Sequence, residues 1–149
     1  MLSNVKLTAA NVPHKDSLTT EEKATLWKNI SSALIETGRP GIKRLLNWMQ
    51  SDCGNGVMNY VNAPASTKYH GNYPGGLMEH SWNVYVWLTI IVGNANSMKD
   101  ADAQLKNEES KAMMDSAAIV ALLHDICKVG FYSMEPKNRK TYDAEKVKN

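Results

Sequence analysis

The sequence predicts an all-α protein, because apolar residues recur at helical spacing along several segments and none alternates convincingly between apolar and polar side chains. The chain has 149 residues, 43% of them hydrophobic and 21% charged, which is typical of one globular domain. Its formal net charge of +2 is too small to favour nucleic acid as a bulk electrostatic partner. We predict a flexible N-terminal arm at residues 1–18, a helical domain at 19–132 and a basic polar tail at 133–149.

Two local patterns predict the first two helices. Thr19 and Glu22 fit a capping box, in which the side chain of each residue accepts a hydrogen bond from the backbone N–H of the other. Apolar residues follow at helical spacing until Gly38 and Pro40 end the helix. A second helix is predicted from Gly41 to Gln50, where apolar residues form a stripe along one side.

The rest of the domain predicts a long loop and two longer helices. Residues 57–76 are rich in Asn, Pro, Gly, Ser and Tyr, and loops of this length are often functional. A third helix is predicted over 77–92, and a fourth over 111–126 that is apolar nearly all round and therefore central. The charged stretch 96–111 fits either a loop or a solvated helix. Four residues of the third helix are expected to face the core: Val84, Trp87, Leu88 and Ile91.

The sequence shows no signal for secretion or for a membrane. The N-terminal segment lacks the apolar core of a signal peptide, and no apolar run approaches the roughly 20 residues that span a bilayer. Cys53 and Cys127 form no CxxC motif and are expected to be reduced thiols, with Cys127 a small buried side chain. We therefore expect a soluble, cytoplasmic protein with no membrane partner.

His124 and Asp125 carry the strongest chemical signal, because they stand side by side where the apolar run 117–123 ends. An imidazole and a carboxylate at such a position can both reach one divalent cation. His80, in the Gly-rich string YPGGLMEHS, falls near the start of the third helix. Antiparallel pairing of the third and fourth helices would bring the three side chains together. The plainer alternative for a single histidine on an apolar helix is a core residue that only packs.

The strings GGLMEHS and ALLHDICK, with a helix between them, resemble the HD-domain superfamily of metal-dependent phosphohydrolases. His80 matches the first metal ligand of that family, and His124 with Asp125 matches its His-Asp doublet. Lys128 matches a lysine that often follows the doublet by one helical turn. The string APASTKYHGNYPGGLMEHSWNVY is similar to HD proteins of bacteria and their phages, and to the HD part of a bacterial 3′-to-5′ exoribonuclease that carries an OB domain. The resemblance covers roughly residues 40–132.

The resemblance implies an HD-domain-like helical bundle that cleaves a phosphoester of a nucleotide or a related substrate with a metal-activated water. It implies metal ligation by His80, His124 and Asp125, with Mn, Fe, Ni, Co or Mg as the divalent ion. Asp125 would also orient the water, Lys128 would balance charge on the phosphate, and His70 would contact the phosphate or a second metal. The implied partner is a small phosphorylated molecule, either a nucleotide or the 3′ end of an RNA.

The last Asp ligand of the family is the one part of the pattern that the sequence does not match. In the family it comes several helices after the doublet, whereas Asp143, in the basic tail, is the sole Asp downstream of Asp125. We therefore expect a chain that is incomplete at its C-terminus relative to the family, with 133–149 either a tail or the start of the missing part. The main alternative is then a catalytically impaired HD domain that binds a nucleotide or a protein partner. A helical bundle with a structural metal is a less favoured third reading.

Overall fold

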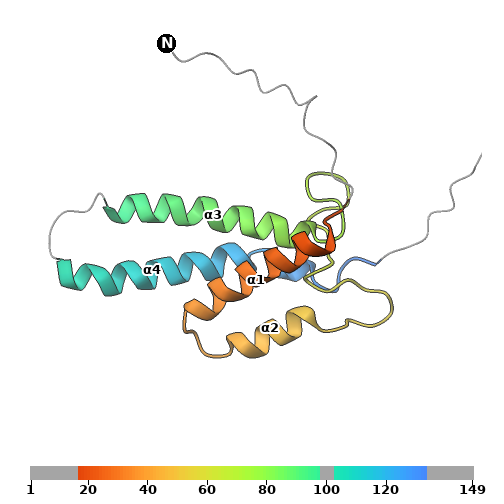
Figure 1. Ribbon diagram of the computed structural model, residues 1–149, viewed down its shortest axis with the longest axis horizontal. Helices are drawn as coiled ribbons and strands as arrows, with labels where there is room; N and C mark the ends of the chain where they lie inside the picture. Colours follow the sequence, from red (N-terminus) through yellow and green to blue (C-terminus); the bar gives the residue numbers. More distant parts are fainter. Residues whose placement is uncertain (1–16, 98–102, 134–149) are drawn as a thin grey trace, which may run out of the picture.

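The computed structural model describes residues 17–97 and 103–133, which form four α-helices, one short 3₁₀ turn and no strand (Figure 1). The prediction of an all-α protein is therefore confirmed. Asp143 and nearly all of the predicted arm and of the predicted tail lie outside these residues. Leu18 was assigned to the arm, but it is buried and lies close to Gly75, so the domain begins before residue 19.

Among the described helices, none is both long enough and apolar enough to cross a membrane.

Helix α1, Thr20–Glu36, begins at the capping box that the sequence predicts. The Thr19 side-chain oxygen accepts the Glu22 N–H at 3.1 Å, and the Glu22 carboxylate accepts the Thr19 N–H at 2.8 Å. The helix is capped at Thr37, and Gly38 follows with a φ of 64°, in the left-handed region that favours glycine. Local side chain–backbone hydrogen bonds therefore define both ends of α1.

Helix α2, Ile42–Gln50, matches the second predicted helix and packs against α1. The loop between α2 and α3 contains no helix, but backbone hydrogen bonds hold its first half against neighbouring segments. The Tyr60 N–H donates to the Met49 carbonyl at 3.2 Å, and the Met58 N–H donates to the Tyr132 carbonyl at 2.8 Å. The loop is thereby joined to α2 and to the segment that follows the last helix.

Helices α3, Gly76–Ser97, and α4, Ala103–Leu123, form the most extensively packed pair of the described helices. Figure 1 shows them side by side and antiparallel, with the start of α3 beside the end of α4. Residues 103–110 of the charged stretch are helical, so α4 begins earlier than the apolar pattern indicated. It also ends three residues before the predicted end, and a 3₁₀ turn, η2 at Ile126–Lys128, follows.

The core lies where α1, α2 and the first half of α3 meet the second half of α4. Buried side chains come from all four helices and from the loop between α2 and α3. The fully buried apolar side chains of greatest volume are Tyr60, Ile30, Leu34, Met49, Leu77, Met78 and Leu122. This packing holds the start of α3 against the end of α4, where the predicted metal ligands lie.

The inward face predicted for α3 is wrong. Trp87 and Ile91 were expected in the core, but they are 68% and 61% exposed. Val84 and Leu88 are half-buried. Because α3 is apolar around most of its circumference, its sequence does not define one inward side. Contact with α4 and α1 decided which side was buried.

Candidate metal centre

The three predicted ligands, His80, His124 and Asp125, lie together at one end of the α3–α4 pair. His80 is in the second turn of α3, and His124 and Asp125 directly follow the last residue of α4. The Nε2 atoms of His80 and His124 are 3.2 Å apart. Asp125 Oδ2 lies 3.5 Å from His80 Nε2 and 3.4 Å from His124 Nε2. The antiparallel pairing of the two helices thus brings these side chains to one point, as predicted.

The donor atoms of this cluster fit one divalent cation. Bonds of about 2.0–2.2 Å from an ion to imidazole nitrogen and carboxylate oxygen place the ligand atoms about 3.0–3.5 Å apart. The three measured separations fall within that range. The side chains are between 21% and 31% exposed, so solvent reaches the cluster. Three protein ligands with an open side are typical of a catalytic site rather than of a closed structural one.

The backbone of α4 holds the His124 imidazole in one tautomer. Its Nδ1 lies 2.8 Å from the Ala121 carbonyl oxygen, which can only accept a hydrogen bond, so Nδ1 carries the proton. In the neutral ring, Nε2 therefore presents a lone pair to the cluster. Metal-binding histidines commonly donate from their second ring nitrogen to a carbonyl in this way.

Lys128 joins the cluster to the loop before α3. Its Nζ donates to Asp125 Oδ2 at 2.7 Å and to the Ala65 carbonyl at 2.6 Å. Burial raises the pKa of the Asp125 carboxyl, but the hydrogen bond and charge of Lys128 outweigh it, with help from His124 and His80, and the net pKa is lowered. Asp125 is therefore ionised near neutral pH, which is the state that a metal ligand requires.

His80 is also held in the state that suits a ligand. Burial lowers the pKa of its imidazole, and the neighbouring His124 lowers it further, whereas the Asp125 carboxylate acts in the opposite direction. A lowered pKa keeps the ring neutral at pH 7, so a nitrogen lone pair is available. The electrostatics of the cluster and its geometry thus point to the same chemistry.

His70, the predicted phosphate or second-metal contact, lies beside the cluster and not within it. Its ring centroid is 5.2 Å from that of His80. The loop that carries His70 closes on itself, with the Ala65 N–H donating to the Gly71 carbonyl at 2.8 Å. It contacts the start of α3, where the Leu77 N–H donates to the Ala63 carbonyl at 3.0 Å. A Cβ at Gly76 would collide with the Gly71 carbonyl oxygen, so glycine is needed there. This close approach explains Gly76, and the positive φ of 92° at Gly75 explains the other glycine of the pair.

Two buried polar groups beneath the cluster were not predicted from the sequence. Tyr60 is fully buried, and its hydroxyl donates to the Leu122 carbonyl at 3.1 Å, although the two residues are 62 positions apart. Ser81, the residue after His80, is also fully buried. Both roles depend on contacts between distant segments, so no local pattern could have revealed them.

Both cysteines are free, as expected, but the expected burial of Cys127 is wrong. Cys127 is exposed because α4 ends before it, and the residue lies in the 3₁₀ turn η2. It is not among the three residues whose ligand atoms cluster in the described part of the chain.

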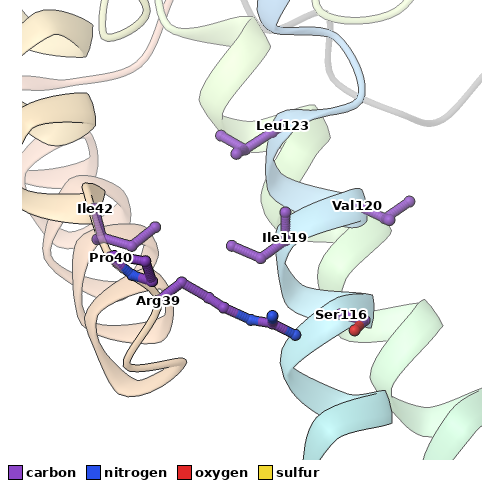
Figure 2. A pocket seen from close by; sticks show the side chains of 7 residues that line it. All are labelled: Arg39, Pro40, Ile42, Ser116, Ile119, Val120 and Leu123. Carbon is purple, nitrogen blue, oxygen red and sulfur yellow. The ribbon is translucent and has the colours of Figure 1, made fainter.

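A groove of about 390 Å³ lies between α4 and the segment that connects α1 to α2 (Figure 2). Arg39 extends across it toward Ser116. The other residues that line it are apolar: Pro40, Ile42, Ile119, Val120 and Leu123. Arg39 is the one charged residue in this lining, which contains no histidine, cysteine or carboxylate. The groove therefore lacks the imidazole and carboxylate atoms with which the His–Asp cluster could hold a metal ion.

Comparison of the chain with protein-family models, with curated proteins and with solved structures found no match.

Proposed function

We propose that this protein is a metal-dependent phosphohydrolase of the HD type that acts on a nucleotide or a related phosphoester. The observation that carries the proposal is the convergence of His80, His124 and Asp125 on separations that suit one divalent ion. The motif resemblance, which singles out the same three residues from the sequence alone, supports it.

The cluster would hold the ion through His80 Nε2, His124 Nε2 and Asp125 Oδ2, and its donor set suits Mn, Fe, Ni, Co or Mg. When bound, such an ion supplies a Lewis acid that polarises a phosphoryl oxygen and lowers the pKa of water. Asp125 Oδ2 faces the histidines and Lys128, which leaves Oδ1 to accept a hydrogen bond from the attacking water. Asp125 thus orients the nucleophile as well as binding the ion.

Two side chains that can donate hydrogen bonds border the cluster and would bind the phosphate of the substrate. Lys128 uses two of its three N–H donors on Asp125 and Ala65, and the third can donate to a phosphoryl oxygen. His70, stacked at an angle beside His80, can donate to a second phosphoryl oxygen. An open site with this charge is suited to an anionic substrate.

The decisive experiment measures metal content and hydrolysis together. Protein purified without chelator is analysed for bound metal. It is then assayed on p-nitrophenyl phosphate and on nucleotides with added Mn, Co, Ni, Fe or Mg. The wild-type chain is expected to bind metal and turn over, and Asp125→Ala is expected to lose both. Asp115→Ala is the matched control, because Asp115 is a partly buried carboxylate of α4 that pairs with Lys111 outside the cluster. Turnover that survives in Asp125→Ala would refute the proposal.

A catalytically impaired HD domain that binds a nucleotide or a protein partner is the second candidate. It is favoured by the size of the cluster, because within the described residues three ligands converge, one fewer than the family pattern contains. Metal and nucleotide binding by the wild-type chain, without hydrolysis under any of the five ions, would identify it. A chain that takes up no metal would reject the active phosphohydrolase, and nucleotide binding alone would then test the impaired domain.

A further inference from the structure

Side chains satisfy two carbonyl groups at the C-terminal end of α4. In a continuing helix, the Leu122 carbonyl would accept the Ile126 N–H. Here it accepts the Tyr60 hydroxyl at 3.1 Å instead. The Ala121 carbonyl accepts Nδ1 of His124 at 2.8 Å. The chain can therefore leave the helix just where the His-Asp pair begins, without burying an unpaired carbonyl.

The Tyr60 hydroxyl lies between the two helices that supply the ligands. Burial raises the pKa of this phenol to about 12, the neighbouring Ser81 hydroxyl lowers it, and the nearby Asp125 carboxylate raises it. Ser81 follows His80 on α3 and is completely buried. Its Oγ is the one buried side-chain polar atom among the described residues that makes no hydrogen bond. The phenol thus adjoins α3, the end of α4 and the ligand cluster.

We propose that Tyr60 is a positioning residue of the metal centre. Its hydroxyl ends α4 at Leu123, so that the next two residues, His124 and Asp125, face His80. This inference rests on the proposed function, because it treats those three residues as metal ligands. Tyr60 is not a ligand itself and acts through the Leu122 carbonyl. Groups that orient metal ligands in this way typically change metal affinity 10–100-fold when they are removed.

The physical reason is the competition for the Leu122 carbonyl. Without the phenol hydroxyl this carbonyl would be buried and unpaired, which is unfavourable. The nearest replacement donor along the chain is the Ile126 N–H, and using it extends α4 by another turn. Successive residues of an α-helix are rotated by about 100°. In the extended helix, the Asp125 side chain would therefore point in a different direction from the one that the present turn gives it. Lys128 would move with it, away from the Ala65 carbonyl.

The test uses Tyr60→Phe in the full chain, with Tyr85→Phe as the matched control. Phenylalanine keeps the ring that packs at 6.4 Å against Trp27, so the fold should persist. Tyr85 is partly buried, and its ring packs against Trp82 on α3, away from the Leu122 carbonyl. Cobalt(II) titration followed by visible absorption is expected to show at least tenfold weaker binding and a changed spectrum for Tyr60→Phe. Tyr85→Phe should match the wild-type protein. Wild-type affinity and spectrum in Tyr60→Phe would overturn the proposal.

A metal-free measurement separates this inference from the proposed function. Amide hydrogen exchange at Ile126 should be at least tenfold slower in Tyr60→Phe than in the wild-type chain, because the extended helix protects that N–H. Equal exchange rates would overturn the positioning role whatever the cobalt result. If the wild-type chain binds no cobalt, the proposed function fails and the exchange measurement alone decides. If Tyr60→Phe does not fold, the wild-type chain is tested by itself: the Ile126 amide should exchange at least tenfold faster than the His124 amide, which donates to the Val120 carbonyl at 2.9 Å. Equal protection of the two amides would overturn the proposal.

Discussion

The imidazoles of His80 and His124 face each other with their Nε2 atoms 3.2 Å apart, although 44 positions separate them in the sequence. His80 lies in α3 and His124 directly follows α4, and the antiparallel contact of these two helices holds the rings together. Two imidazoles this close cannot both be protonated without strong repulsion, and one divalent ion would satisfy both lone pairs. Asp125 supplies the negative charge that such an ion requires.

Removal of either histidine is expected to abolish metal-dependent stabilisation. A ligand that binds only the folded state at 100 times its Kd adds about 2.7 kcal/mol to the free energy of unfolding. The wild-type Tm should therefore rise on addition of manganese or cobalt, and the Tm of His80→Ala and of His124→Ala should not. Differential scanning fluorimetry with and without the ion measures this. A metal-induced rise that persists in both variants would show that the ion binds elsewhere.

The stability of the metal-free protein should fall in mildly acidic solution because of His80. Burial and His124 lower the pKa of this imidazole in the folded state, so the unfolded chain binds its proton more readily. The contribution of His80 to the free energy of unfolding is fully present above its pKa in the unfolded chain, about 6.5. It is lost as the pH falls from that value toward the lower pKa of His80 in the folded state. Urea unfolding between pH 8 and pH 5 should show this decline. His80→Gln should reduce it, and an identical decline in the variant would contradict the assignment. The effect is small because the His80 side chain is 25% exposed.

Replacement of Lys128 by Met should affect both stability and catalysis. The variant loses the hydrogen bonds to Asp125 and to the Ala65 carbonyl, which we expect to cost about 1 kcal/mol after allowing for partial exposure. Turnover should fall more steeply than stability, because the phosphate loses a cationic contact. Lys111→Met is the matched control, since its ion pair with Asp115 is on the surface of α4 and should contribute less than about 0.5 kcal/mol. Chemical unfolding and phosphatase kinetics distinguish the two lysines.

His70→Ala should separate metal binding from turnover. His70 lies beside His80 but outside the ligand cluster, so metal affinity should change by less than about threefold. The phosphatase kcat/KM should fall by at least about tenfold, because a donor to the phosphate is lost. Isothermal titration with manganese and steady-state assays test the two parts. Metal affinity reduced as strongly as in His80→Ala would instead make His70 a ligand.

Core and surface positions of the helical pair should respond very differently to truncation. Leu122 is fully buried, so Leu122→Ala should lower the free energy of unfolding by about 2–5 kcal/mol. Trp87 is 68% exposed, so Trp87→Ala should cost less than about 1 kcal/mol despite its larger side chain. Urea unfolding of both variants provides the comparison. A cost for Trp87→Ala as large as that for Leu122→Ala would mean that this face of α3 is covered in solution.

Features that depend on neighbouring residues could be predicted from the sequence alone. The start of α1 follows from the reciprocal hydrogen bonds of Thr19 and Glu22, three positions apart. The all-α fold follows from helical periodicity, and the convergence of His80 with His124 and Asp125 follows from antiparallel pairing of two successive helices. In each case the feature depends on residues close together in the sequence or on the pairing of two helices that follow one another along the chain.

The tertiary structure decided what depends on distant contacts. α4 ends at Leu123, where the Tyr60 hydroxyl, far away in sequence, donates to the Leu122 carbonyl, and no helical propensity encodes that contact. Lys128 binds the Ala65 carbonyl 63 positions away, which ties the loop to the cluster. The buried side of α3 was likewise set by its neighbours, because an apolar helix has no unique inward face until other elements pack against it.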